Sequence, residues 1–162
     1  MSQTNELEIM ERIALDLERV EESLASSFNT GAEDFNALIR PLSAAGGKRL
    51  RAQLCLLIAN AGTSIERQRI KIAEAVEMLH LATLIHDDVL DQAEIRRGED
   101  TIHMHKGNKV AILSGDYLFA KAFKIVSEMT NMKYLQVFSH IITCLVEGEF
   151  MQMEDVYRID QG

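Results

Sequence analysis

The chain has 162 residues, of which 47% are hydrophobic and 26% are charged, so it is long enough to bury the core of one domain. A formal net charge of −8 argues against a nucleic acid partner, and only two cysteines exclude a disulfide framework. The first eleven residues are polar and acidic, which predicts no signal peptide, and no apolar run is long enough for a membrane span. We therefore expect a cytoplasmic protein.

The predicted elements are helices almost throughout. The sequence has one proline and is rich in residues that favour helix, which indicates an all-α fold. Apolar residues recur at helical spacing in six long segments: 6–27, 33–43, 48–61, 64–91, 109–129 and 133–157. Residues 99–106 are predicted to form a loop. No internal repeat or linker interrupts the pattern, so we expect a single domain over residues 1–162.

A first cluster of cations stands at the expected start of the third helix, in residues 46–51 (Gly-Gly-Lys-Arg-Leu-Arg). Glycines before a helix let backbone amides approach an anion, and the helix N-terminus adds positive potential. In a helix that includes both, Lys48 and Arg51 are three residues apart and face one way. A solvated basic turn would look the same. The spacing is not that of a nucleotide-binding P-loop.

A second cluster ends the fourth helix. Asp87 and Asp91 are four residues apart, so their carboxylates share one side of the helix, with His80 two turns earlier. Two carboxylates so placed repel each other, and a bridging hard cation relieves this repulsion; oxygen-only ligands favour magnesium over zinc. Arg96 and Arg97 follow, and in a helix they would point about 100° apart and serve two anions. Metal and paired arginines together indicate phosphate or diphosphate chemistry.

Each of these clusters also has an ordinary structural interpretation. The pattern Asp-Asp-x-x-Asp matches many solvated helix ends, and Arg96, Arg97 and Gly98 are typical of a helix C-terminus with a glycine cap. The combination of both clusters at these spacings is what favours a functional site.

Together, residues 46–152 resemble the trans-isoprenyl diphosphate synthases, the polyprenyl synthetase family, and in particular its long-chain (hepta- and octaprenyl-type) members. The resemblance implies a helical bundle of the isoprenoid synthase type. It also implies a magnesium-dependent prenyltransferase that condenses isopentenyl diphosphate with an allylic prenyl diphosphate. Ala52 departs from the proline that many members have there, a position where proline favours the helix start.

Carried over position by position, the resemblance implies a role for each motif residue. Isopentenyl diphosphate would be held by Lys48, Arg51, His80 and Arg97. Asp87, Asp88 and Asp91 would be the catalytic aspartates, with Asp87 and Asp91 as the magnesium ligands. Arg96 would support the allylic diphosphate. The small residues Ala82 and Thr83 stand where bulky side chains limit product length in the family, so the resemblance implies a long-chain product, such as a quinone side-chain precursor.

The resemblance covers only the N-terminal half of the family's domain. The family's second aspartate-rich motif and Lys-Thr pair are not found in these residues, so the expectation is that the isolated chain binds magnesium-diphosphate but turns over poorly. Segments 109–129 and 133–157 correspond to helices that build the family's dimer, which implies a homodimer or a heteromeric prenyltransferase. The alternative is a non-catalytic regulatory or scaffolding subunit. Terpene cyclases share Asp-Asp-x-x-Asp but not the paired basic motifs.

Overall fold

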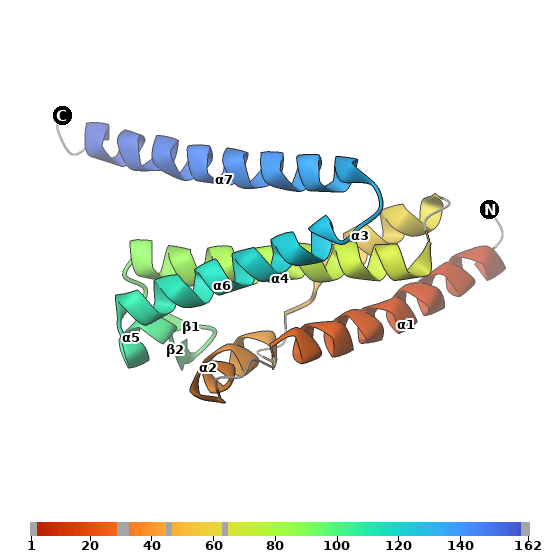
Figure 1. Cartoon of the computed structure of the whole chain (residues 1–162), viewed down its shortest axis with the longest axis horizontal. Helices are drawn as coiled ribbons and strands as arrows, with labels where there is room; N and C mark the ends of the chain where they lie inside the picture. The colour runs from red at the N-terminus through yellow and green to blue at the C-terminus, as the bar shows by residue number, and fades with distance from the viewer. Residues whose placement is uncertain (1–2, 29–32, 45–46, 63–64, 160–162) are drawn as a thin grey trace. The chain divides into compact units, whose positions relative to one another are not determined.

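The computed structural model describes residues 3–28, 33–44, 47–62 and 65–159 (Figure 1). These residues are mostly helical, and the predicted all-α class is confirmed. In chain order the helices are α1 (Gln3–Ser27), α2 (Glu33–Ala44), α3 (Leu50–Ala61), α4 (Glu66–Leu90), α5 (Ile102–Lys106), α6 (Asn108–Ser127) and α7 (Met132–Ile159). A short antiparallel hairpin, β1 (Ile95–Arg96) and β2 (Glu99–Asp100), connects α4 to α5.

The chain divides into two compact units, Met1–Ile125 and Val126–Gly162. The first unit holds α1 to α5 and most of α6, and all the predicted site residues lie in it. The second unit holds the end of α6 and the whole of α7. The single domain expected over residues 1–162 stays a prediction.

Helix α4 is the centre of the first unit, because it packs against both α1 and α3, and these two also pack against each other. A stripe of α1 at spacings of three and four residues is buried, as expected for an amphipathic helix; it consists of Ile13, Asp16, Val20 and Leu24. Helix α4 is instead buried on most sides, and its buried residues include Met78, Leu81 and Ile85. Burial on several sides explains why apolar residues occur on most sides of this helix.

A buried ion pair and a buried, hydrogen-bonded carboxylate fix α1 against α4. Arg69 donates to both carboxylate oxygens of Asp16, at 2.6 and 3.2 Å, and both side chains are almost fully buried. One turn further along α4, the buried carboxylate of Glu74 accepts hydrogen bonds from Ser23 and Ser27, each at 2.7 Å. Such groups are costly to bury unless every one is paired, so they allow only one register between the two helices.

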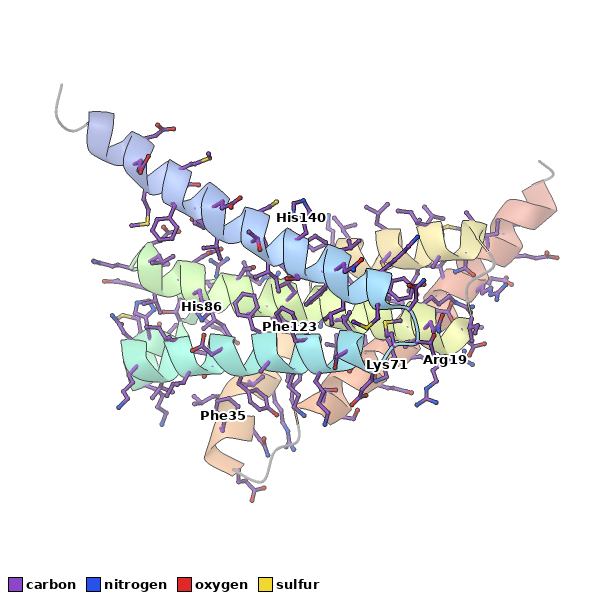
Figure 2. All side chains as sticks on the ribbon, turned by 45° about the horizontal axis from the view of Figure 1, so that its top comes forward. Arg19, Phe35, Lys71, His86, Phe123 and His140 are labelled. Atoms are coloured by element: carbon purple, nitrogen blue, oxygen red, sulfur yellow. The ribbon has the colours of Figure 1, made fainter. Side chains whose placement is uncertain are left out.

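Helix α6 packs on α4 through a glycine. A Cβ atom at Gly115 would stand 2.5 Å from Cδ2 of His86, so the His86 ring lies directly against the α6 backbone. His86 lies between α4 and α6 (Figure 2), with its Nε2 3.2 Å from the carbonyl oxygen of Ile112 and its ring tilted against Phe119. The helix-to-helix approach therefore depends on the absence of a side chain at Gly115.

The region after α4 differs from the sequence prediction. The loop predicted over residues 99–106 is wrong, because β2 and α5 form there. Arg97 and Gly98 have positive φ angles, 54° and 86°, which is the two-residue turn that suits the twist of a tight hairpin. Strands of two residues have no measurable hydrophobic period, so the pattern could not show them.

No helix within the described ranges is apolar over enough residues to cross a bilayer.

Candidate functional site

The three aspartates at the end of α4 occupy two different environments. Asp91 caps the helix with helical backbone angles, and its N–H donates to the carbonyl oxygen of Asp87 at 2.8 Å. The helical geometry therefore reaches Asp91, which is exposed, and keeps it on the side of Asp87, which is half-buried. Asp88 is buried instead, and its Oδ1 accepts a 2.6 Å hydrogen bond from Nε of Arg96.

The two arginines after α4 lie in the hairpin and not in a helix, so the helical angle predicted between them is wrong, as is the ordinary alternative of a helix C-terminus. Arg96 is on β1 and turns back to Asp88. Arg97 is the first turn residue, and its guanidinium lies against the loop before α3, 3.4 Å from where a Cβ of Gly47 would be. A positive φ at Arg97 thus sends two adjacent arginines to different parts of the site.

The loop before α3 places its basic residues by a mechanism that helical spacing did not predict. Helix α3 begins at Leu50, so Lys48 lies outside it and the prediction that Lys48 shares a helical face with Arg51 is wrong. The reason is Arg49, whose backbone is left-handed (φ 44°, ψ 37°) and directly precedes the helix. Lys48 and Arg51 are both exposed, while Arg49 between them is buried.

The N-terminus of α3 is partly occupied by a carboxylate of the protein itself. The N–H of Ala52 donates to Oε1 of Glu77, a buried residue of α4, at 3.0 Å. This amide in the first turn of the helix is therefore not available to an external anion. Charge for an anion near this helix start would come mainly from the side chains of Lys48 and Arg51.

The positive charges of three arginines act on the imidazole of His80. It is half-buried on α4, and burial lowers the pKa of its imidazole below the ordinary value. The positive charges of Arg51, Arg97 and Arg96 lower the pKa further, whereas the carboxylate of Glu77 opposes them. A neutral imidazole surrounded by cations is suited to gain a proton when a polyanion arrives.

Asp87 and Asp91 have the donor chemistry that magnesium requires. Magnesium typically keeps several waters and takes one or two protein carboxylates together with substrate phosphates. Two carboxylates on one side of a helix end, one of them exposed, fit such a partial set of ligands. Among the residues that the structure describes, no group of three or more His, Cys, Asp or Glu side chains forms a closed metal site. The arrangement suits an ion shared with a diphosphate.

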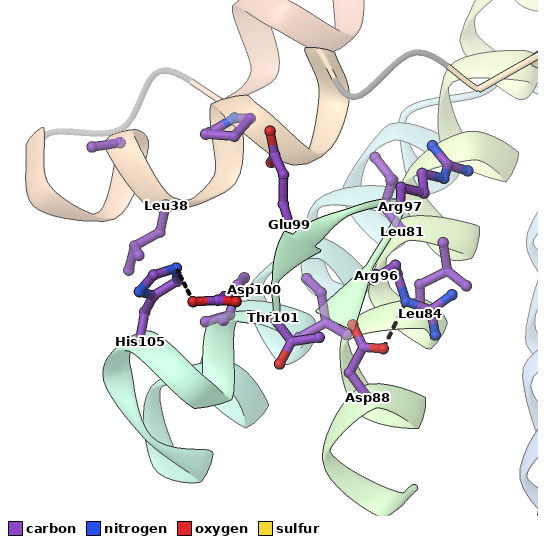
Figure 3. Close-up of a pocket in the computed structure, with 14 residues that line it drawn as sticks. Leu38, Leu81, Leu84, Asp88, Arg96, Arg97, Glu99, Asp100, Thr101 and His105 are labelled. Atoms are coloured by element: carbon purple, nitrogen blue, oxygen red, sulfur yellow. Dashed lines mark hydrogen bonds and ion pairs between the residues drawn. The ribbon is translucent and has the colours of Figure 1, made fainter. Parts of the chain in front are cut away.

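A pocket of about 570 Å³, lined in part by Asp88, Arg96 and Arg97, lies between α2, α4 and the hairpin (Figure 3). Its apolar wall comes from α2 and α4, and its polar wall includes the Asp88–Arg96 pair and an Asp100–His105 contact of 3.7 Å. The residues proposed to set product length, Ala82 and Thr83, are not part of its lining. Ala82 is fully buried and lies one turn before His86, on the side of α4 that meets α6.

Two residues of this region were missed by the sequence analysis. Arg49 and Glu77 form a buried ion pair, with Nη1 and Oε2 3.5 Å apart, between the loop and α4. Glu77 carried a usable signal, because a carboxylate three residues before His80 in an apolar helix needs a partner. The identity of that partner could not be inferred, because Arg49 is 28 residues away in the sequence.

Comparison with known proteins gives consistent results. The family model for polyprenyl synthetase matches residues 32–161. Heptaprenyl diphosphate synthase component 2 of Geobacillus stearothermophilus is 39% identical over 147 residues, which are 90% of this chain and 46% of that protein. Octaprenyl diphosphate synthase of Escherichia coli (strain K12) is 32% identical over 148 residues, which are 91% of this chain and 46% of that protein.

Solved structures agree in fold and in extent. A polyprenyl synthase from Caulobacter crescentus CB15, complexed with calcium and isoprenyl diphosphate, superposes with a TM-score of 0.84 at 35% identity, over 90% of this chain and 44% of that one. The geranylgeranyl pyrophosphate synthase of Lactobacillus brevis gives a TM-score of 0.84 at 31% identity, over 88% and 45%. The chain spans less than half the length of these relatives. Because the family model covers most of it and the fold agrees, the chain belongs to the polyprenyl synthetase family.

Proposed function

We propose that this chain carries the isopentenyl diphosphate site and one magnesium-diphosphate site of a trans-prenyl diphosphate synthase. The observation that carries this proposal is the approach of Arg97 to Gly47, which brings the hairpin to the loop before α3 (residues 47–49, called the basic loop below). Arg51 and Arg97 both act on the pKa of His80, so one diphosphate could meet all three. Membership of the family supports the same reading.

The proposed division of work follows from the two environments at the end of α4. Asp87 and Asp91 would hold Mg²⁺, which neutralises the allylic diphosphate and makes it a better leaving group. Arg96 would support that diphosphate, and its position is set by the buried carboxylate of Asp88. In this proposal Asp88 keeps its predicted place in the motif but acts through Arg96. A cytoplasmic location remains part of the proposal.

The proposed product is a long-chain prenyl diphosphate. Relatives named heptaprenyl and octaprenyl diphosphate synthases support this, as do the small side chains of Ala82 and Thr83. Thr83 is the better site for a test, because it is half-buried, whereas Ala82 is fully buried and a Phe there would overpack the helix interface. In an elongating enzyme, Thr83→Phe should shorten the product on chromatography; unchanged length would refute this assignment.

The proposed function is tested by binding. Titration calorimetry of the chain with isopentenyl diphosphate should show binding that Lys48→Ala weakens about tenfold or more, because a charge-assisted contact of about 1.5–3 kcal/mol is lost. Lys109→Ala is the matched control, an exposed lysine at the start of α6. Equal losses in both variants, or no binding by the folded wild type, would refute the proposal.

Self-association is part of the proposal. Apolar side chains that recur every four residues on α7 are exposed, namely Val137, Ile141 and Leu145, and such a row is suited to contact another chain. The Geobacillus stearothermophilus relative is named a component of its enzyme, which supports a heteromeric form as the second possibility. In a heteromeric enzyme, this chain could also be the non-catalytic regulatory or scaffolding subunit. Sedimentation at micromolar concentration should show a dimer or larger species, and a clean monomer would contradict homodimer formation.

A further inference from the structure

Arg49 is a cation of the basic loop that faces away from the surface where its neighbours lie. Its side chain is only 6% exposed, whereas Lys48, Leu50 and Arg51 are all exposed. Its Nε and Nη2 donate to the two carboxylate oxygens of Glu21 on α1, at 2.5 and 3.1 Å. Two parallel bonds of this kind fix both the position and the plane of a guanidinium.

The same guanidinium also reaches α4. Nη1 of Arg49 is 3.5 Å from Oε2 of Glu77, and the other oxygen of Glu77 accepts the N–H of Ala52 at 3.0 Å. The buried carboxylate of Glu77 therefore holds both the loop residue Arg49 and the first turn of α3. Arg49 and Glu77 together connect the loop, α1, α3 and α4 at one point.

This connection explains a backbone conformation that is otherwise unfavourable. Arg49 is left-handed, a conformation that is unfavourable for a residue with a Cβ and persists only where surrounding contacts hold it. The left-handed residue ends the loop and starts α3 directly after it, so Lys48 stays outside the helix and Arg51 lies in its first turn. The orientation of both exposed cations thus depends on the contacts of Arg49.

We propose that Arg49 is a positioning residue of the diphosphate site, held by Glu21 and Glu77, and that it orients Lys48 and Arg51 without contacting the anion itself. This inference rests on the proposed function, because it assigns a positioning residue to the same diphosphate site. Burial is the reason that Arg49 cannot serve the anion directly: its guanidinium is already enclosed by two carboxylates.

The structure offers a matched control. Arg69 is a second buried arginine that links α4 to α1 by two hydrogen bonds to one carboxylate, that of Asp16, but it lies near the start of α4, away from the basic loop. Arg49→Lys and Arg69→Lys each keep the charge and lose the paired geometry. Both variants should lower the melting temperature, so loss of stability alone does not distinguish them.

The test is calorimetric binding of pyrophosphate, in the absence of magnesium, by the full chain, at a temperature where circular dichroism shows each variant folded. Arg49→Lys should weaken binding about tenfold, whereas Arg69→Lys should stay within about twofold, since it is distant from the site. Glu21→Ala is the second variant and decides the matter if Arg49→Lys does not fold. Removing a carboxylate should by itself favour anion binding, so weaker binding in Glu21→Ala would point to lost positioning.

The outcomes separate this inference from the proposed function. If the wild type binds, Lys48→Ala weakens binding, and both Arg49→Lys and Glu21→Ala bind like the wild type, then Arg49 is not a positioning residue although the proposed site stands. If the folded wild type does not bind pyrophosphate, the proposed function is wrong and this inference falls with it. Weaker binding in Arg49→Lys but not in Arg69→Lys supports the assignment.

Discussion

Replacing Gly115 by alanine should separate α6 from α4. The added Cβ would stand 2.5 Å from Cδ2 and 2.9 Å from Cε1 of His86, distances that carbon atoms do not tolerate. The ring would have to move on the order of 1 Å to restore normal contact. Overpacking of this kind costs about 1–3 kcal/mol, and loss of the His86 contact with the Ile112 carbonyl about 1 kcal/mol more. Helix propensity returns about 1 kcal/mol.

The net expectation for Gly115→Ala is therefore a loss of about 1–3 kcal/mol in the free energy of unfolding. Urea denaturation followed by circular dichroism measures this difference. Gly148→Ala on α7 is the control, because its added Cβ would meet nothing within 4 Å and should stabilise the helix by about 1 kcal/mol. A Gly115→Ala variant as stable as the wild type would refute the close approach described here.

Because the pKa of His80 is lowered and a bound diphosphate would raise it, pyrophosphate affinity should increase as the pH falls below about 6.5. His80→Gln should remove this pH dependence of the affinity in calorimetric titrations. The same pH dependence in His80→Gln would show that His80 does not meet the anion. Asp88→Ala should lower the free energy of unfolding, measured by chemical denaturation, by about 1–3 kcal/mol, because it leaves Arg96 unpaired. Asp91→Ala should change it by no more than about 0.5 kcal/mol, because Asp91 is exposed, and equal effects would contradict the different environments of the two aspartates. Cys144 is exposed, while burial raises the pKa of Cys55. Iodoacetamide should therefore alkylate Cys144 before Cys55, as followed by mass spectrometry, and the reverse order would contradict this prediction.

Local spacing was sufficient to predict the long helices and one part of the site. Hydrophobic residues at helical period predicted the long helices, because a helix repeats its environment every few residues. The shared side of Asp87 and Asp91 followed from their spacing of four, since that geometry is internal to one helix. The family resemblance rested on the same short motifs, and the family model covers them.

The contacts that position the site depended on tertiary structure. Arg97 approaches Gly47 across 50 positions of sequence, and Arg49 pairs with Glu77 across 28, so no local period could indicate either contact. The left-handed backbone at Arg49 also escaped prediction, because that conformation is unfavourable for arginine by itself and requires partners from α1 and α4. The residue types, and the side of α4 that Asp87 and Asp91 share, were thus determined by the sequence alone. Which cations converge and which are buried was decided by the packing of α1, α3 and α4, because burying a charge requires a partner that only the folded chain supplies.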